Sequence, residues 1–238
     1  MSIKAGLVGL PNVGKSTLFN ALTKSSIPAE NYPFCTIDPH VAITEVPDQR
    51  IIKLKEMYGS QKIIPATVTF VDIAGLVKGA ASGEGLGNQF LGHIRDVNLI
   101  LHVLRCFEDP NITHVADAVD PLSDYEVIMQ ELMLKDFETV EKRMQKIEST
   151  KKKMSPSEQK NADMEYDLLK KIKELLDKGN ATSVKQIIDH ASVEMVPLLS
   201  GKNFLIIANV AEAELEDNVY LKNKHFNALA QKFGIERV

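Results

Sequence analysis

Short apolar runs alternate along this chain with amphipathic and polar stretches. Each run is five or six residues long, which is typical of strands buried in a sheet. The segment from Ser16 to Lys24 follows the first run closely and has the pattern of a helix. Strands that alternate with helices favour an α/β fold with a mostly parallel sheet covered on both faces. The expected strands are Ile3 to Val8, Val41 to Val46, Thr67 to Val71, Leu99 to Leu104 and Phe204 to Ala208.

The stretch from Asp124 to Lys153 has a different pattern. It contains no proline or glycine, and its apolar residues recur at alternating steps of four and three, the spacing of a coiled-coil seam. Ser155-Pro156-Ser157 then interrupts the chain and can cap a second helix, which runs to Lys178 and ends at Gly179-Asn180. We therefore predict an antiparallel helical hairpin. The seam residues are Met133, Phe137, Val140, Met144 and Ile147 on the first helix, and Leu168, Leu169, Ile172, Leu175 and Leu176 on the second.

These patterns divide the 238 residues into three parts. We expect residues 1–122 and 201–238 to form one α/β domain, and residues 123–200 to form an inserted helical domain. The formal net charge of −4 argues against a basic surface over the whole chain, so any contact with nucleic acid has to be local. The run Lys151-Lys152-Lys153 at the predicted hairpin tip is one candidate for contact with RNA, although a solvated turn is the simpler interpretation.

We find no targeting signal and no cysteine motif in this sequence. The N-terminus does not read as a secretory leader, and no apolar run approaches the roughly 18 residues that a membrane span needs. We expect a cytoplasmic protein that does not contact membranes. Cys35 and Cys106 lack the spacing of a metal site, and a reducing compartment would keep both as thiols.

The first chemical motif follows the first predicted strand. Residues Gly9 to Ser16 match G-x-x-x-x-G-K-[ST], the phosphate-binding loop of nucleoside triphosphatases, placed between a strand and a helix as that loop requires. Lys15 is expected to neutralise the β- and γ-phosphates, and the Ser16 hydroxyl to hold Mg²⁺. The expected nucleotide-binding residues here are Asn12, Val13, Gly14, Lys15, Ser16 and Thr17.

A second motif, Asp72-Ile73-Ala74-Gly75, follows the predicted strand Thr67 to Val71. The Asp72 carboxylate at the strand's end is expected to orient the Mg²⁺ ion, and the Gly75 N–H to contact the γ-phosphate. Thr36 lies between the two motifs and is the candidate for the first switch loop, where its hydroxyl could reach Mg²⁺. The alternative is that Thr36 merely begins the extended segment toward Val41.

Four segments share a joint pattern that is very specific: Gly9 to Thr17, Asn31 to Thr36, Asp72 to Ala80 and Gly83 to Asn88. Together they closely resemble the YchF family, the Obg-like ATPases, which are Obg-related P-loop NTPases. The similarity continues through the segment His102 to Phe107 and ends near Tyr220. It implies a Ras-like nucleotide-binding domain with an inserted helical domain, Mg²⁺-dependent ATP hydrolysis and association with ribosomes.

The base-reading motif departs from that of ordinary GTPases. In place of N-K-x-D the chain has Asn209-Val210-Ala211-Glu212. Adenine has an acceptor at N1, so a buried carboxylate aimed there would lack a donor, at a cost of roughly 1 to 3 kcal/mol. The resemblance implies that backbone groups near Asn209 and Val210 recognise adenine, with Glu212 turned away. We therefore expect ATP to be preferred over GTP; the alternatives are a degenerate GTPase motif, or a strand end followed by a solvated loop acid.

The catalytic group also differs from that of Ras-like enzymes. Leu76 follows Gly75 where those enzymes carry a glutamine that orients the attacking water, and leucine cannot do this. The resemblance suggests His114 for that role, so Lys15 and His114 are the candidate catalytic residues and slow intrinsic turnover is expected. Asn12 could also bind a K⁺ ion beside the phosphates. Gly79, Gly83, Gly85 and Gly87 could form a second switch that orders with the γ-phosphate.

Three classes of function remain open from these patterns. The first is an ATP-hydrolysing switch enzyme, the second a nucleotide-gated module that binds ribosomes with little hydrolysis, and the third a GTPase with an altered base motif. A monomer is favoured. The family resemblance also leads us to expect a further strand and a C-terminal TGS domain, which do not follow Val238 in this sequence.

Overall fold

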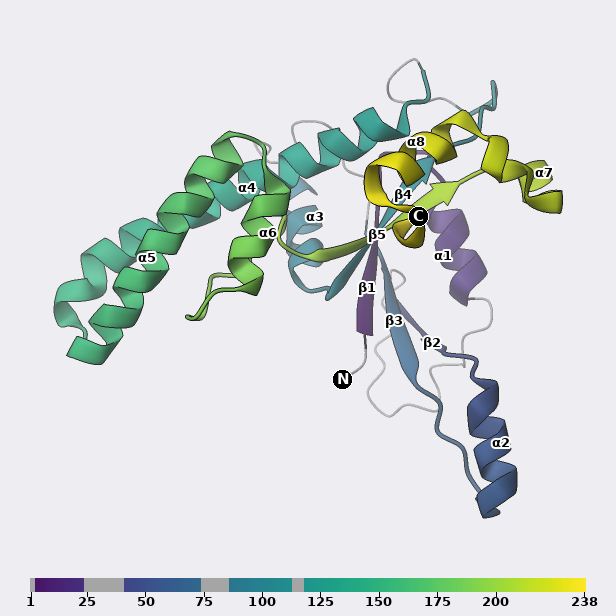
Figure 1. Ribbon diagram of the computed structural model, residues 1–238, viewed down its shortest axis with the longest axis horizontal. Helices are drawn as coiled ribbons and strands as arrows, with labels where there is room; N and C mark the ends of the chain where they lie inside the picture. Colours follow the sequence, from purple (N-terminus) through teal and green to yellow (C-terminus); the bar gives the residue numbers. More distant parts are fainter. Residues whose placement is uncertain (1–2, 24–40, 74–85, 113–117) are drawn as a thin grey trace.

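The computed structural model describes residues 3–23, 41–73, 86–112 and 118–238. A sheet stands at the centre of this part of the chain, and a long helical hairpin projects away from it (Figure 1). All five predicted strands are present, with bounds that differ by at most one residue at either end. They are β1 (Ile3–Val8), β2 (Val41–Glu45), β3 (Thr67–Asp72), β4 (Leu99–Arg105) and β5 (Asn203–Asn209).

The strand order within the described sheet is β2-β3-β1-β4-β5. β1, β3, β4 and β5 run parallel, and β2 pairs antiparallel with β3. The predicted mostly parallel α/β fold is therefore confirmed. The register places Leu7 opposite Asp72 and Arg105 opposite Asn209, so the carboxyl ends of the parallel strands meet at one edge. In open α/β sheets this edge is where ligands bind.

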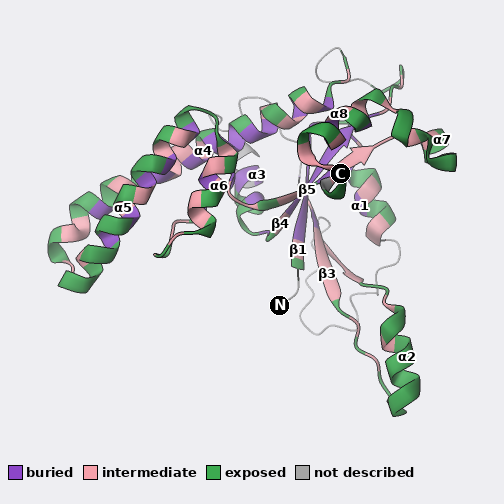
Figure 2. Ribbon diagram, in the orientation of Figure 1, coloured by how far each residue is buried: buried purple, intermediate pink, exposed green. Residues whose placement is uncertain are grey.

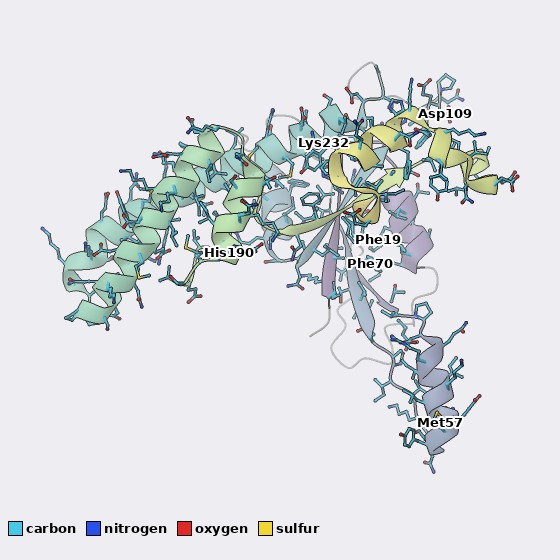
Figure 3. All side chains as sticks on the ribbon, viewed as in Figure 1. Phe19, Met57, Phe70, Asp109, His190 and Lys232 are labelled. Atoms are coloured by element: carbon cyan, nitrogen blue, oxygen red, sulfur yellow. The ribbon has the colours of Figure 1, made fainter. Side chains whose placement is uncertain are left out.

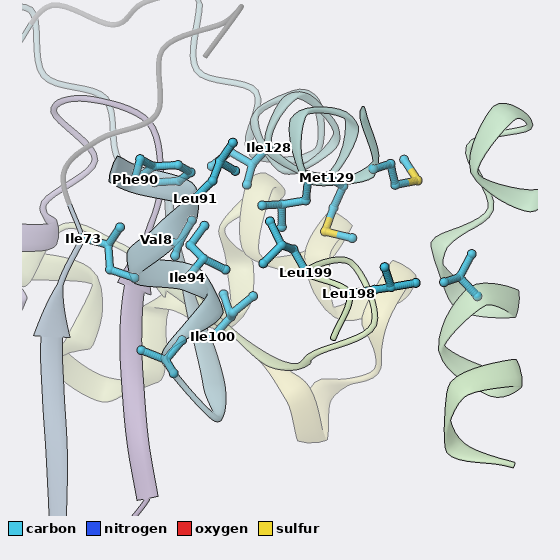
Figure 4. Close-up of a cluster of buried hydrophobic side chains, with 14 of the residues drawn as sticks. Val8, Ile73, Phe90, Leu91, Ile94, Ile100, Ile128, Met129, Leu198 and Leu199 are labelled. Atoms are coloured by element: carbon cyan, nitrogen blue, oxygen red, sulfur yellow. The ribbon is translucent and has the colours of Figure 1, made fainter. Parts of the chain in front are cut away.

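Helices pack on the sheet and complete its core. α1 (Lys15–Thr23) follows β1, α3 (Leu86–Arg95) precedes β4, and α8 (Lys224–Phe233) follows β5. Ile73, Ile94 and Val8 are fully buried beside β1, and the same apolar cluster continues to Ile128 and Leu199 at the root of the hairpin (Figure 4). Full burial of one such side chain contributes about 1.5–3 kcal/mol. The strands and the hairpin root therefore share one core.

A helix that was not predicted from the sequence follows β2. α2 (Gln49–Tyr58) begins at Asp48, whose carboxylate accepts from the Arg50 N–H, and ends at Gly59 with φ 61°. None of its residues is buried, and Met57 lies 76% exposed near its outer end (Figures 2 and 3). Ile51, Leu54 and Tyr58 recur at helical spacing along it, so a periodic signal for this helix was present in the sequence.

The predicted hairpin is present. α4 (Pro121–Thr150) starts at the Asp120 cap, three residues before the predicted beginning, and a short 3₁₀ turn, η2 (Lys151–Lys153), leads to α5 (Pro156–Asp177). Ser155 and Glu158 form the capping box that opens α5. Val140, Ile147, Leu169 and Ile172 of the predicted seam are all buried, which accounts for the close packing of the two helices.

A buried carboxylate joins the hairpin to the sheet. Asp136 of α4 is 1% exposed and accepts from the backbone N–H groups of Leu199 and Ser200, at 2.7 Å each, and from the Ser200 hydroxyl at 2.6 Å. These two residues come just before β5, after the short helix α6 (Ala181–Asp189). The root of the hairpin is therefore tied to the start of the strand that carries Asn209.

The end of the chain covers one side of β5. It contains α7 (Glu212–Leu215), the 3₁₀ segment η3 (Glu216–Lys222), α8 and a last 3₁₀ turn, η4 (Ile235–Arg237). Asn223 caps α8 by accepting from the His225 and Phe226 N–H groups. Of the helices described, none is both long and apolar enough to cross a membrane.

Candidate functional site

The phosphate-loop sequence forms a compact turn at the carboxyl end of β1. Asn12 and Gly14 adopt positive φ angles of 63° and 97°, which bring the chain back over the strand before α1 starts. Asparagine and glycine are the residues that tolerate this region. An added Cβ on Gly9 would lie 2.5 Å from the Val103 carbonyl oxygen of β4. The two motif glycines are thus required by backbone angle at Gly14 and by close packing at Gly9.

Lys15 lies inside this turn. Its side chain is largely buried, and its ammonium donates to the Leu10 carbonyl at 2.7 Å. Burial lowers the pKa of Lys15, and the nearby Asp72 carboxylate partly opposes that shift. An ammonium has three donors, so the group that holds the loop can also reach a phosphate oxygen. The predicted phosphate-binding cation is therefore positioned in the loop itself.

Ser16 and Asp72 meet although 56 residues separate them in the sequence. The Ser16 hydroxyl donates to the Asp72 carboxylate at 2.9 Å. A hydroxyl and a carboxylate oxygen side by side are the hard donors that Mg²⁺ prefers, with the remaining positions filled by water and phosphate. No group of three or more His, Cys, Asp or Glu side chains in the described ranges could hold a metal alone. The pair fits an ion that binds together with a nucleotide.

Asn209 connects the base motif to the phosphate loop. Its side-chain amide donates to the Val13 carbonyl at 2.9 Å, and an added Cβ on Gly14 would lie 2.3 Å from the same nitrogen. The end of β5 and the phosphate loop are therefore locked together. Thr17 is exposed at the start of α1, Val210 is half-buried, and Glu212 is exposed at the start of α7.

A cavity of about 360 Å³ opens beside this motif, between the ends of β4 and β5 and the start of α8. His225 contributes an imidazole whose Nε2 is buried without a hydrogen-bond partner among the described residues. Burial, followed by the charge on Lys224, lowers the pKa of His225, which favours the neutral ring. The cavity is lined by Cys106, Phe107, Glu108, Ala211, Glu214, Asn223, Lys224 and His225.

Arg105 fixes the loop that forms one wall of this cavity. The side chain is 2% exposed, and its guanidinium donates to the carbonyls of Phe107, Asp109 and Ile112 at 3.0 to 3.2 Å. The same group lies 4.6 Å from the centre of the Phe107 ring. Arg105 and Phe107 were not among the predicted site residues. Their position directly at the end of a strand that neighbours β1 was the available signal.

Three predicted site residues lie outside the described residues. These are Thr36, Gly75 and His114, so the switch threonine, the γ-phosphate contact and the catalytic histidine stay predictions. Gly79, Gly83 and Gly85 of the proposed second switch also fall there, as does Leu76.

Comparison with known proteins identifies the family of the chain. A family model described as "50S ribosome-binding GTPase" matches residues 4–184. The chain is 48% identical over 219 residues to "Ribosome-binding ATPase YchF" of Bacillus subtilis, covering 91% of this chain and 59% of that protein. It is 45% identical over 223 residues to the protein of the same name from Escherichia coli O157:H7, covering 93% and 60%.

A solved structure gives the same result for the fold. The "Schizosaccharomyces pombe YchF GTPase" superposes with a TM-score of 0.72 at 36% identity, covering 98% of this chain and 64% of that one. The chain thus spans about three fifths of the length of these relatives. It belongs to the family of 50S ribosome-binding GTPases, and the resemblance to YchF proteins that its motifs indicated is confirmed.

Proposed function

We propose that this chain is the nucleotide-binding part of a Mg²⁺-dependent switch protein that hydrolyses ATP in preference to GTP and associates with ribosomes in the cytoplasm. The observation that carries the proposal is the contact between the Ser16 hydroxyl and the Asp72 carboxylate at 2.9 Å, beside the buried Lys15. This arrangement suits a nucleotide that binds together with its metal ion. The names of the relatives support the ribosome as the partner.

Three kinds of group in this chain bind the phosphates: the Lys15 ammonium, the backbone N–H groups of the loop, and the side chains that hold the metal ion. Lys15 donates to the β- and γ-phosphates, and the loop N–H groups from Val13 to Thr17 surround them at the N-terminus of α1. Ser16, Asp72 and Thr36 would hold a Mg²⁺ ion, which would neutralise charge that develops on the phosphate oxygens. A K⁺ ion at Asn12 gains no support from the comparisons and is not part of the proposal.

The base site favours adenine for two reasons. Glu212 is exposed and does not line the cavity, so its carboxylate is poorly placed to accept from the guanine N1–H and amino group. The second reason is that Val210 stands where N-K-x-D has a lysine, which leaves an apolar surface beside the base. Val210 and the Phe107 ring instead offer apolar contact, and backbone groups near Asn209 can pair with the adenine edge.

Catalysis requires a group that orients water, since Leu76 cannot. We propose His114 for this role, with slow turnover in the absence of a partner. A His114→Ala variant is expected to lower kcat about 100-fold while its affinity for Mg²⁺-ADP stays unchanged. Equal kcat values for the variant and the parent chain would remove His114 from the mechanism.

The first experiment compares Mg²⁺-ADP and Mg²⁺-GDP binding by calorimetry. We expect ADP to bind at least about tenfold tighter, which is about 1.4 kcal/mol. Lys15→Ala should abolish binding of both, while Lys62→Ala, a change at an exposed lysine outside the site, should leave both unaffected. If GDP binds tighter, the adenine assignment fails.

A GTPase is the second candidate function. The matching family and the solved yeast relative are both described as GTPases, whereas the bacterial relatives are named ATPases. The same calorimetry decides between the two nucleotides. Hydrolysis measured on ATP and GTP under identical conditions then separates a switch enzyme from a module that binds nucleotide without turnover.

A further inference from the structure

The base loop, residues 209–211, is anchored at both of its ends. The Cys106 N–H donates to the Asn209 carbonyl at 2.8 Å. The Ala211 N–H donates to the Glu214 carboxylate at 2.9 Å. In the proposed function, backbone groups of this loop pair with the edge of the base. The two hydrogen bonds therefore set where those backbone groups lie.

Asn223, the cap of α8, contacts both residues that anchor the base loop. Its amide nitrogen donates to the Cys106 carbonyl at 2.9 Å and to the Glu214 carboxylate at 2.8 Å. Its amide oxygen accepts from the His225 and Phe226 N–H groups at 2.9 and 3.1 Å. An asparagine amide has two N–H donors and an oxygen with two lone pairs, so this side chain makes every hydrogen bond open to it. One residue thus connects the segments after β4 and β5 with the start of α8.

Glu214 carries this connection to the base loop. One carboxylate oxygen accepts from the Asn223 amide, and the other accepts from the Ala211 N–H. The Glu214 backbone N–H also donates to the Ala211 carbonyl at 2.9 Å. Hydrogen bonds to an ionised acceptor are stronger than bonds between neutral groups, and their geometry is well defined. The orientation of the Glu214 carboxylate therefore depends on Asn223, and the position of Ala211 depends on Glu214.

Capping of α8 explains only half of these contacts. A helix cap needs only an acceptor oxygen. Asn180, which caps α6, accepts from the Ser183 N–H at 3.0 Å, and its amide nitrogen has no hydrogen-bond partner within the described part of the chain. The amide nitrogen of Asn223, by contrast, bonds to two groups outside α8. The two asparagines therefore share the capping role and differ in the second one.

We propose that Asn223 is a positioning residue for the base of the nucleotide. It orients the Glu214 carboxylate and the Cys106 carbonyl, and through them it holds the base loop in the conformation that contacts the base. The inference rests on the proposed function and adds to it the residue that fixes the base-reading backbone. No phosphate-loop residue lines the cavity beside Asn223. A change at Asn223 should therefore weaken ligands that carry a base and spare ligands that consist of phosphate alone.

The test measures the affinities for Mg²⁺-ADP, Mg²⁺-GDP and Mg²⁺-pyrophosphate by calorimetry. Pyrophosphate keeps the two phosphates and lacks the sugar and the base. Asn223→Asp retains both capping acceptors and removes both donors, so it separates the two roles of the side chain. We expect this variant to bind ADP about tenfold more weakly than the parent chain and pyrophosphate within about twofold. Asn180→Asp, the same change at the α6 cap, should leave both affinities within about twofold.

A double variant reverses the direction of one hydrogen bond and gives a second readout. When Asn223→Asp is combined with Glu214→Gln, the amide introduced at position 214 can donate to the carboxylate introduced at position 223. The oxygen of that amide can still accept from the Ala211 N–H. We expect this chain to recover ADP affinity to within about threefold of the parent chain. A residue that only caps α8 would show no such recovery, because Asn223→Asp already keeps the cap.

Three results would each overturn the inference: equal weakening of ADP and pyrophosphate, parental ADP affinity in Asn223→Asp, or no recovery in the double variant. The same data judge the proposed function separately. If the parent chain prefers GDP and Asn223→Asp weakens GDP but not pyrophosphate, the adenine assignment fails and the positioning role stands. If the parent chain prefers ADP and Asn223→Asp binds it equally well, the adenine assignment stands and the positioning role fails. Pyrophosphate binding by each variant also shows that it is folded.

Discussion

At the scale of single residues, the phosphate loop requires a glycine at position 14. Gly14 combines a φ of 97° with a distance of 2.3 Å between a would-be Cβ and the Asn209 amide nitrogen. That amide in turn holds the Val13 carbonyl. A side chain at position 14 would therefore strain the backbone and break the link between the phosphate loop and β5.

We expect Gly14→Ala to weaken Mg²⁺-ADP binding at least about tenfold, as measured by calorimetry. Two matched changes separate the causes. Gly59→Ala meets a positive φ of 61° with nothing within 4 Å, so it should cost about 1–2 kcal/mol of stability and leave ADP binding intact. Gly92→Ala, in helix α3 with open space around it, should be neutral or stabilising. ADP binding by Gly14→Ala at the parental affinity would contradict the geometry.

His102 makes folding sensitive to acid. This β4 residue is 1% exposed, and its Nε2 has no hydrogen-bond partner among the described residues. Burial, and then the charge of Lys15, lower its pKa to about 3. A histidine in the unfolded chain has a pKa near 6.5. Between about pH 6.5 and 3, His102 is therefore protonated in the unfolded chain but neutral in the folded chain. The contribution of His102 to stability is therefore present above pH 6.5 and is lost as the pH falls toward 3.

A His102→Leu variant should show less of this dependence. Between pH 7 and pH 5 its loss of unfolding free energy, measured by urea denaturation, should be smaller than that of the parent chain by about 2 kcal/mol. Both proteins lose stability through other groups, so the difference between them is the quantity to compare. Parallel pH profiles would mean that His102 is protonated in the folded state.

At the scale of elements, β5 connects the hairpin root to the nucleotide site. Its start follows the Asp136 bonds to Leu199 and Ser200, and its end carries Asn209 on the phosphate loop. Lys202, just before the strand, donates to the Arg95 and Val97 carbonyls at the end of α3. Distant parts of the chain therefore converge on the short segment that precedes β5.

Asp136→Asn should test this junction. Burial raises the pKa of Asp136 against the opposing effect of its three hydrogen bonds, and an amide in its place cannot accept from all three donors. We expect a loss of about 3 kcal/mol and a fall in melting temperature of about 6–12 °C. Glu138→Gln removes the 2.9 Å pair with Lys135 on the same helix and should cost less than about 1 kcal/mol. If both variants lost similar amounts of unfolding free energy, the hydrogen bonds of Asp136 would not stabilise this junction.

At the scale of the whole molecule, the distal part of the hairpin is expected to be dispensable for the nucleotide site. α5 packs on α4 and α6, and Glu141 meets Lys173 at 2.6 Å where the two long helices are still adjacent. Replacing residues 142–172 with a short glycine-serine turn at that point should leave Mg²⁺-ADP affinity within about twofold, since the removed part contains no site residue. Loss of ADP binding would instead show that residues 123–200 are not an independent insertion.

The sequence predicted the five strands, the two long helices and the phosphate loop because each carries a local signal: an apolar run, a four-and-three seam, or glycines at fixed spacing. The two motifs also led us to expect Ser16 and Asp72 at one metal site, although not the direct hydrogen bond between them. The helix α2 was not predicted, although Ile51, Leu54 and Tyr58 recur in it at helical spacing. Phe107 and Arg105 were missed although they lie at the end of a strand that neighbours β1, because the cavity that Phe107 lines is built from segments distant in the sequence.

What the sequence determined by itself is the order of elements and the chemistry carried by Gly9 to Ser16, since both are set by residue type and spacing along the chain. What only the tertiary structure decided is contact between distant segments. The Asn209 amide on the Val13 carbonyl, the Asp136 carboxylate on the segment before β5, and the Glu165 carboxylate on the Arg143 guanidinium all depend on register and packing. Such contacts join residues that are far apart in the sequence, so the local sequence around one residue does not predict which residue it will contact.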